Sequence, residues 1–157
     1  MISADDDDRG VVFVRADHRT GTIAALAGVF ATRGMNFDSL ATGILDGEHG
    51  FVIVTFRAND RQQRMLVRSV ERLAPVRAVS VRRAEDLGVR AAAVVHLPVG
   101  VDFRPPRHAA VSWSGSSALG QPVLVEGSLV DVEAVVASAR SAGARVEATA
   151  IEPPAGT

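Results

Sequence analysis

The first half of the chain alternates between strand-like and helix-like periods of hydrophobic residues. The run from Val11 to Val14 is β-branched and aromatic and ends at a polar stretch, as is typical of a buried strand followed by a loop. After Gly21, apolar residues recur at the i, i+3, i+4 and i+7 spacing of an amphipathic helix: Ile23, Leu26, Ala27 and Phe30. Gly34 sits where a helix ends on a left-handed residue, so the pattern predicts a helix over residues 21–33.

Two strands, a second helix and a last strand are predicted next. Residues 36–45 and 51–57 are typical of strands, and the turn-rich stretch between them is typical of a hairpin. Asn59 offers a cap for a second apolar helical stripe, and residues 76–81 close the unit as a strand. The order strand, helix, strand, strand, helix, strand predicts an α+β fold of the ferredoxin-like βαββαβ type, with an antiparallel sheet covered by both helices on one face.

A second, weaker copy of the same order follows. Strands are predicted over 90–97, 109–113, 122–127 and 145–151, with a helical stripe over 132–139 before the last of them. The copy lacks its first helix, because the stretch from Pro98 to His108 contains adjacent prolines and no helical period. The expected organisation is a disordered tail over 1–9, a first domain over 10–83, a linker over 84–89 and a second, smaller or degraded module over 90–152.

Composition and charge narrow the class of protein. The chain has no cysteine and a formal net charge of -1 without a basic cluster, which disfavours disulfide scaffolds, thiolate zinc sites and nucleic-acid binding. No apolar run reaches the roughly 20 residues of a membrane helix, and the N-terminus is acidic where a signal peptide is positive. We therefore expect a cytoplasmic protein that does not bind membranes, and we interpret Asp5 to Asp8 as part of a solvated tail.

The loop before the first helix carries the candidate chemistry. A strand that passes through Gly21 into a helix presents free backbone N–H groups at the positive end of the helix dipole, which suits a carboxylate. Asn36 adds a side-chain amide that can both donate and accept hydrogen bonds. A carboxylate together with an ammonium group describes an amino acid, although junctions of this kind are also ordinary turns.

Catalytic and metal sites are disfavoured. His49, His96 and His108 lack a second ligand at metal spacing, and the serines around Trp113 lack the turn and partners of a catalytic triad. Arg19 with Asn36 superficially fits an acylphosphatase, but only one glycine is available to shape its phosphate loop. An RNA-binding surface would need aromatic side chains on the strands, and the candidates are Phe13, Phe51 and Phe56. The 4% aromatic content and the negative net charge of the chain disfavour this function.

Two stretches carry a resemblance to a known family. The segment DHRTGTIA from Asp17 to Ala24, followed by GVFATRGMNFDSL from Gly28 to Leu40, closely resembles the opening of the small regulatory subunits of acetolactate synthase, whose domains are ACT domains. The resemblance covers residues 11–83 and returns over 123–146. The chain differs from the family at His18, where the family usually has Asn or Asp. It also differs in lacking the first helix of the second module.

The resemblance implies a function. It implies a dimer that binds a branched-chain amino acid between the loop of one copy and the Asn-bearing segment of the other. The residues implied in effector binding are His18, Gly21, Thr22, Ile23 and Asn36. It also implies a large catalytic synthase subunit as partner, which itself holds thiamine diphosphate, so that this chain needs no cofactor or metal. The alternative is a stand-alone ACT protein that senses an amino acid or a related small acid for another enzyme or pathway.

The strands also bear on assembly. Phe51, Ile53 and Thr55 alternate with apolar neighbours, so neither face of the sheet is strongly polar. A sheet face without a helix of its own then needs a partner or the rest of the chain to cover it. We expect a homodimer.

Overall fold

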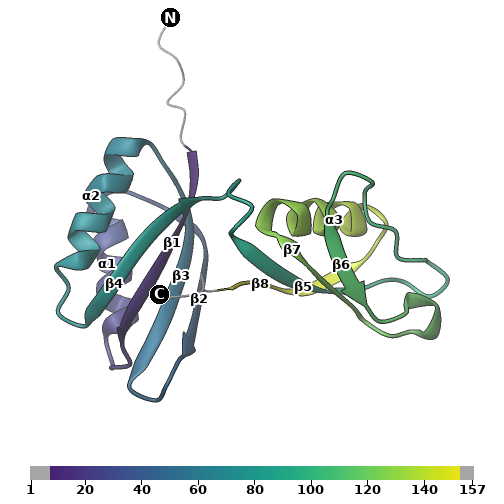
Figure 1. The fold of residues 1–157 in the computed structure, drawn as a ribbon, viewed down its shortest axis with the longest axis horizontal. Helices are drawn as coiled ribbons and strands as arrows, with labels where there is room; N and C mark the ends of the chain where they lie inside the picture. Colours follow the sequence, from purple (N-terminus) through teal and green to yellow (C-terminus); the bar gives the residue numbers. More distant parts are fainter. Residues whose placement is uncertain (1–7, 153–157) are drawn as a thin grey trace, which may run out of the picture. The chain divides into compact units, whose positions relative to one another are not determined.

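A computed structural model describes residues 8–152, and the chain divides between Ala84 and Glu85 into two compact units (Figure 1). The expected tail lies outside the described residues as far as residue 7. Asp8 and Arg9, which the pattern placed in that tail, instead begin the first strand. Asp8 pairs with Ala58 across the sheet, and its carboxylate lies 2.6 Å from Nη2 of Arg83, so local charge is offset by a cross-strand partner.

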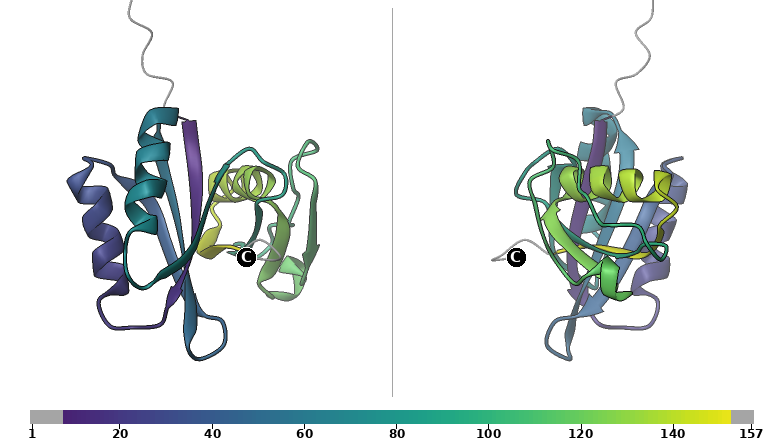
Figure 2. Two further views of the ribbon diagram at one scale, coloured as in Figure 1. Left: turned by 60° about the vertical axis from the view of Figure 1, so that its left-hand side comes forward. Right: turned by 90° about the vertical axis from the view of Figure 1, so that its right-hand side faces the viewer.

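Unit 1 has the predicted ferredoxin-like order. Its elements are β1 (Asp8–Asp17), α1 (Thr22–Thr32), β2 (Phe37–Ile44), β3 (His49–Ala58), α2 (Asp60–Glu71) and β4 (Val76–Arg83). The strands lie in the order β2-β3-β1-β4 with antiparallel neighbours throughout. Both helices cover the same face of this sheet (Figure 2). The order places β2 and β4 at the edges and β1 near the centre.

The core of unit 1 lies between the sheet and its helices. Alternate residues of β1 and β3 point toward the helices, as the period of a strand requires: Val12, Val14, Ala16, Val52, Val54 and Phe56. Leu26 and Phe30 of α1 pack against these strand residues from the helix side of the sheet. Phe30 contacts Phe56 edge to face, with ring centroids 5.9 Å apart. Such aromatic pairs stabilise a core beyond the area they bury.

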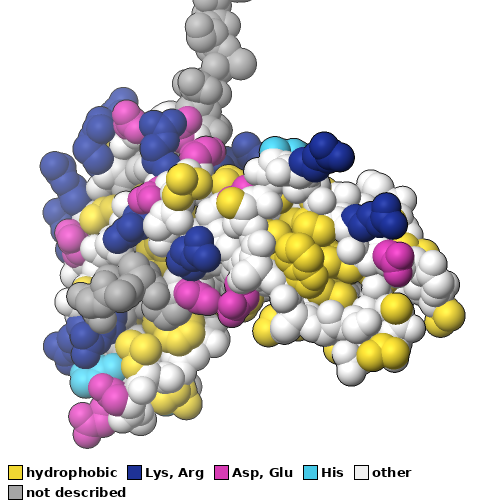
Figure 3. Space-filling model, turned by 45° about the vertical axis from the view of Figure 1, so that its right-hand side comes forward, with side chains coloured by type: hydrophobic (Ala, Val, Ile, Leu, Met, Phe, Trp, Pro, Cys, Tyr) yellow, Lys and Arg dark blue, Asp and Glu magenta, His cyan; other side chains and the backbone are white. Residues whose placement is uncertain are grey.

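The two helices of unit 1 present very different surfaces. Asn59 precedes α2 and caps it with a capping box, in which Asn59 and Gln62 exchange side-chain and backbone hydrogen bonds. Its exposed side is rich in arginine, and arginine side chains stand out along unit 1 in Figure 3. α1 contains no charged residue from Thr22 to Thr32. A helix that is apolar on most of its circumference is usually covered by something.

Unit 2 repeats the topology with one helix fewer. Its elements are β5 (Arg90–His96), β6 (Val111–Ser114), a 3-10 turn η1 (Ser117–Leu119), β7 (Val123–Ser128), α3 (Leu129–Ser141) and β8 (Arg145–Ile151). The strand order β6-β7-β5-β8 matches that of unit 1 position by position. α3 therefore corresponds to α2, and no helix stands between β5 and β6, as the prolines predicted.

A loop supplies the apolar surface that the missing helix would have provided. Leu97, Phe103 and Ala109, all from the segment between β5 and β6, pack against the core of unit 2. That core is formed by Val95, Val123, Val125, Val135 and Ala139.

Within residues 8–152, no helix is both long and apolar enough to cross a bilayer.

Candidate functional site

The start of α1 is open and lacks a side-chain cap. Gly21 precedes the helix with φ 91°, a left-handed conformation that favours glycine, and no side chain caps the helix. Thr22 Oγ1 donates to the carbonyl of Asp17 at 3.3 Å, so this hydroxyl turns back toward β1. Across the described part of the chain, the backbone N–H groups of Ile23 and Ala24 have no hydrogen-bond partner. These donors lie at the positive end of the helix dipole.

The space beside this helix start is unfilled. A Cβ placed on Gly21 would meet no atom within 4 Å. Ile23, in the first turn, exposes 42% of its surface. A small anion with an apolar group can therefore approach the free N–H groups without displacing any of the described side chains.

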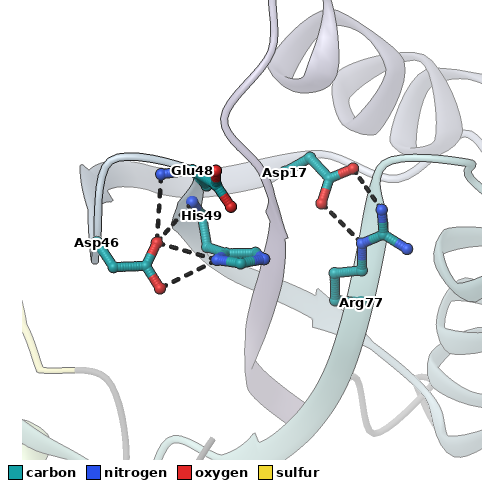
Figure 4. Close-up of polar contacts among 5 residues, drawn as sticks. All are labelled: Asp17, Asp46, Glu48, His49 and Arg77. Carbon is teal, nitrogen blue, oxygen red and sulfur yellow. Dashed lines mark hydrogen bonds and ion pairs between the residues drawn. The ribbon is translucent and has the colours of Figure 1, made fainter.

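A charged cluster fixes the end of β1 just before the loop (Figure 4). Asp17 accepts hydrogen bonds from Nε and Nη2 of Arg77 on β4 at 2.7 and 2.6 Å, and Nη2 of Arg19 lies 2.9 Å from the same carboxylate. The backbone N–H of Asp17 also donates to the carbonyl of Pro75 at 2.7 Å. The fork of an arginine fits a carboxylate with two parallel hydrogen bonds, which makes this an oriented contact.

This cluster changes the titration of both partners. Hydrogen bonding from Arg77 lowers the pKa of Asp17 below its usual value, and the same contact raises the pKa of Arg77. The carboxylate of Asp17 is therefore ionised and already matched by two guanidinium groups. It is not available to receive an ammonium group from a ligand.

His18 lies between the loop and the β2–β3 hairpin. Its backbone N–H donates to the carbonyl of Glu48 at 2.8 Å, and its Nδ1 would lie 3.7 Å from a Cβ on Gly50, so the exposed imidazole sits beside β3. In the hairpin, Asp46 accepts from the backbone N–H of His49 at 2.8 Å, and Nδ1 of His49 lies 2.9 Å away (Figure 4). Hydrogen bonding from His49 lowers the pKa of Asp46.

Asn36 lies at the far end of α1. It follows Gly34, which has φ 62°, and Met35, whose N–H donates to the carbonyl of Phe30, and it directly precedes β2. α1 has 11 residues, so its ends are about 16 Å apart. Of the sequence-predicted site residues, a single chain brings together His18, Gly21, Thr22 and Ile23, and it does not bring Asn36 to them.

A shallow groove of about 260 Å³ runs between the two helices of unit 1. It is lined mainly by one side of α1, and Arg33 Nη2 closes one end by donating to Ser69 Oγ at 2.8 Å. The groove does not include any of the residues expected to bind an effector. Among residues 8–152, no group of three or more His, Cys, Asp or Glu side chains is arranged to hold a metal ion.

Sequence reasoning missed Asp17 and Arg77. They lie 60 residues apart and their contact has no local signature in the sequence, so only the register of β1 and β4 brings them together. From the sequence, no role was expected for His49. In the structure, His49 pairs with Asp17 across β1 and β3, which places it beside the loop that follows β1.

Solved structures share the fold of this chain. A small subunit of acetolactate synthase from Thermotoga maritima superposes with a TM-score of 0.63 over 91% of this chain and 92% of that one, at 17% sequence identity. The chain therefore shares the fold of that subunit, with a ferredoxin-like α+β module in unit 1 and a related module in unit 2. The ferredoxin-like expectation and the resemblance carried by residues 17–40 are thus confirmed at the level of the fold.

Two further matches are weaker. The regulatory subunit of aspartate kinase from Thermus thermophilus covers 88% of this chain and 95% of its own length, with 16% identity and a TM-score of 0.48. The ACT domain of a GTP pyrophosphokinase from Chlorobium tepidum covers 48% of this chain and 99% of its own, with 13% identity and a TM-score of 0.44. No protein-family model matches the sequence. No curated protein matches it either.

The Asp17 cluster predicts an acid-dependent loss of stability in unit 1. Because folding lowers the pKa of Asp17, its contribution is present above the unfolded-state value near pH 4 and is lost as the pH falls through the lower folded value. We expect Asp17→Asn to lower the melting temperature at pH 7, and the difference from wild type to shrink below about pH 4.

Arg77→Gln and the double variant complete the test. If Asp17 acts through Arg77, the two single changes should be strongly non-additive in melting temperature at pH 7. Additive effects, or an Asp17→Asn difference that does not change with pH, would show that the pair does not anchor the loop.

Proposed function

We propose that this chain is a non-catalytic regulatory subunit that binds an amino acid, with a branched-chain amino acid as the first candidate, and modulates a thiamine-diphosphate-dependent acetolactate synthase. The observation that carries the proposal is the uncapped start of α1 at Gly21 on a tandem ACT fold. The fold alone fits many functions, but this loop has the free donors, the open space and the motif that an amino-acid carboxylate requires.

The separation of Gly21 from Asn36 supports a site built by two chains. Each chain has one half of the site at each end of α1. If two copies pack with their α1 helices antiparallel about a two-fold axis, the loop of one copy comes beside Asn36 of the other. The arrangement gives two equivalent sites per dimer.

The edge of unit 1 suits such a dimer. β2 pairs only with β3, so its other edge has backbone groups free of any strand partner among the described residues. Phe37 and Ile44 lie near the two ends of β2, on the helix-covered face, and expose 42% and 60% of their surfaces. Antiparallel pairing of β2 with β2 of a second copy is self-complementary and sets Phe37 of one copy opposite Ile44 of the other.

The neighbouring surface of α1 is equally suited. Ala24, Gly28 and Ala31 are exposed and small, so another helix can approach closely without desolvating a charge. α2, by contrast, has exposed arginines that would repel a second copy of themselves.

Effector binding should depend on both halves of the site. Gly21→Asp should abolish binding of valine, leucine and isoleucine, because it fills the open space and places a negative charge where the carboxylate binds. Asn36→Ala should weaken binding about ten- to a hundredfold, the usual effect of losing a hydrogen bond to a charged group. Titration calorimetry measures both.

Gly100→Asp is the matched control. Gly100 has φ 82° and open space around its Cβ, so the change brings comparable backbone strain and the same charge but lies in unit 2. It should bind the effector like wild type. If Gly21→Asp and Asn36→Ala also bind like wild type, the site is wrongly placed.

The dimer should depend on the edge of β2. Ile44→Asp adds a charge to an exposed edge residue, so it should leave the monomer folded and raise the dimer dissociation constant at least about tenfold. Val99→Asp, at a fully exposed position of unit 2, should not change it. Sedimentation analysis at micromolar concentration would contradict the proposal if wild type is a monomer or if both variants dimerise equally well.

The catalytic partner can be tested directly. We expect the purified chain not to convert pyruvate, and we expect it to co-purify from its host with a large synthase subunit and to alter that subunit's sensitivity to valine. Turnover of pyruvate by this chain alone would overturn the non-catalytic assignment. Co-purification with an unrelated enzyme would instead favour the second candidate.

That second candidate is a stand-alone ACT sensor of a small acid. Two observations favour it: His18 stands where the acetolactate synthase family usually has Asn or Asp, and the carboxylate of Asp17 is engaged by Arg77 and Arg19. Neither side chain then offers a negative charge to an ammonium group. Tighter binding of a 2-oxo acid than of the matching amino acid in the same calorimetric series would select this function.

A further inference from the structure

Unit 2 contains a hollow of about 300 Å³ that belongs to neither the predicted site nor its dimer surface. It lies where the loop after β5 meets the segment between β6 and β7. Its principal lining residues are Asp102, Phe103, Arg104, Trp113, Ser116 and Ser117. The volume is at the lower end of the range for small-molecule sites, which fits a ligand the size of an amino acid.

The missing helix of unit 2 creates the apolar side of this hollow. Phe103, from the loop that replaces the helix, packs against the core. Trp113 pairs with Val125 across β6 and β7, so it points to the core-facing side of the sheet. The two rings meet edge to face with centroids 5.5 Å apart, and Trp113 still exposes 51% of its surface. A large aromatic surface is thus held in place but only partly covered.

The polar side is fixed by backbone contacts. The N–H of Phe103 donates to Ser117 Oγ at 3.0 Å, which ties the two segments together. The N–H of Ser116 donates to Oε1 of Gln121 at 3.1 Å. Gly115 has φ 94°, and a Cβ there would clash with the backbone carbonyl oxygen of Pro122, so any other residue at this turn would be strained. The walls are therefore formed before any ligand arrives.

Two opposite charges stand side by side at the mouth. Nη2 of Arg104 lies 3.9 Å from Oδ2 of Asp102, at the outer limit of an ion pair, and both side chains are largely exposed. Such a loose surface pair contributes little by itself, so each charge can turn to a ligand at small cost. A carboxylate next to Arg104 and an ammonium next to Asp102 would match the two ends of a zwitterion.

We propose that this hollow is a second amino-acid site, which takes a zwitterion with an aromatic side chain. The side chain packs on Trp113, the carboxylate pairs with Arg104, and the ammonium pairs with Asp102. Ser117 Oγ accepts from Phe103 and keeps its hydroxyl proton to donate to the ligand carboxylate. Because both charges face water, the expected affinity is modest and ligand discrimination rests on the charge pair.

The chain carries its own probe for this site. Trp113 is its one tryptophan and it has no tyrosine, so emission excited at the red edge of tryptophan absorption reports on the hollow alone. The experiment titrates the full chain carrying Gly21→Asp with L-phenylalanine, 3-phenylpropionate and phenethylamine. The Gly21→Asp background removes the proposed site of unit 1, so failure at one site leaves the other proposal standing.

We expect a saturable change with phenylalanine in the millimolar range, and weaker binding, by about two- to fivefold, of each ligand that lacks one charge. Arg104→Ala should make phenylalanine and phenethylamine bind equally, and Asp102→Asn should make phenylalanine and 3-phenylpropionate bind equally. Arg107→Ala, an exposed arginine of the same loop outside the hollow, should preserve the full order.

Three results would overturn the proposal. The first is no saturable binding of phenylalanine by fluorescence and by calorimetry on the same samples. The second is equal binding of all three ligands to the chain with its charges intact. The third is the same loss of discrimination in Arg107→Ala as in Arg104→Ala, which would point to general surface charge.

Discussion

The pairing of β1 with strands on both sides is the constraint from which the rest of unit 1 follows. β1 pairs with β3 from Asp8 to Asp17 and with β4 over most of the same length. One face of this central strand carries the core that seats both helices. Its last residue, Asp17, is locked to Arg77 of β4, so the loop that follows starts from a fixed point and delivers Gly21 to the start of α1. The position of the proposed site at Gly21 thus follows from the strand pairing in the sheet of unit 1.

Much of this could be predicted from the sequence because the determining signals are local. Alternation along β3, the apolar stripe after Gly21 and the Asn59 cap each specify an element within a few residues. What could not be predicted depends on register between distant segments. The Asp17–Arg77 contact has no local signature, and the pairing that recruits Asp8 into β1 overrides its charge. The loop between β5 and β6 has no period, so the seating of Phe103 in the core could not be foreseen.

The two units solve one topological problem in two ways. Both have the same strand order, and in both the first crossover must cover half of the sheet. Unit 1 covers it with α1, a helix almost without polar groups. Unit 2 covers it with an irregular loop anchored by Phe103, which leaves Trp113 partly uncovered. A helix gives a smooth surface suited to another copy, whereas a loop gives an uneven one suited to a small molecule.

The length of α1 has a consequence for how such a protein would report on its surroundings. In the proposed dimer, one ligand touches two chains, so its binding free energy is shared with association and each process strengthens the other. Occupancy would then follow the amount of the protein as well as the amount of the ligand. At a ligand concentration that saturates the protein when it is abundant, a smaller fraction of the protein would bind ligand when it is dilute. Because a helix of 11 residues separates the two halves of the proposed site, ligand binding would also report the concentration of the protein itself.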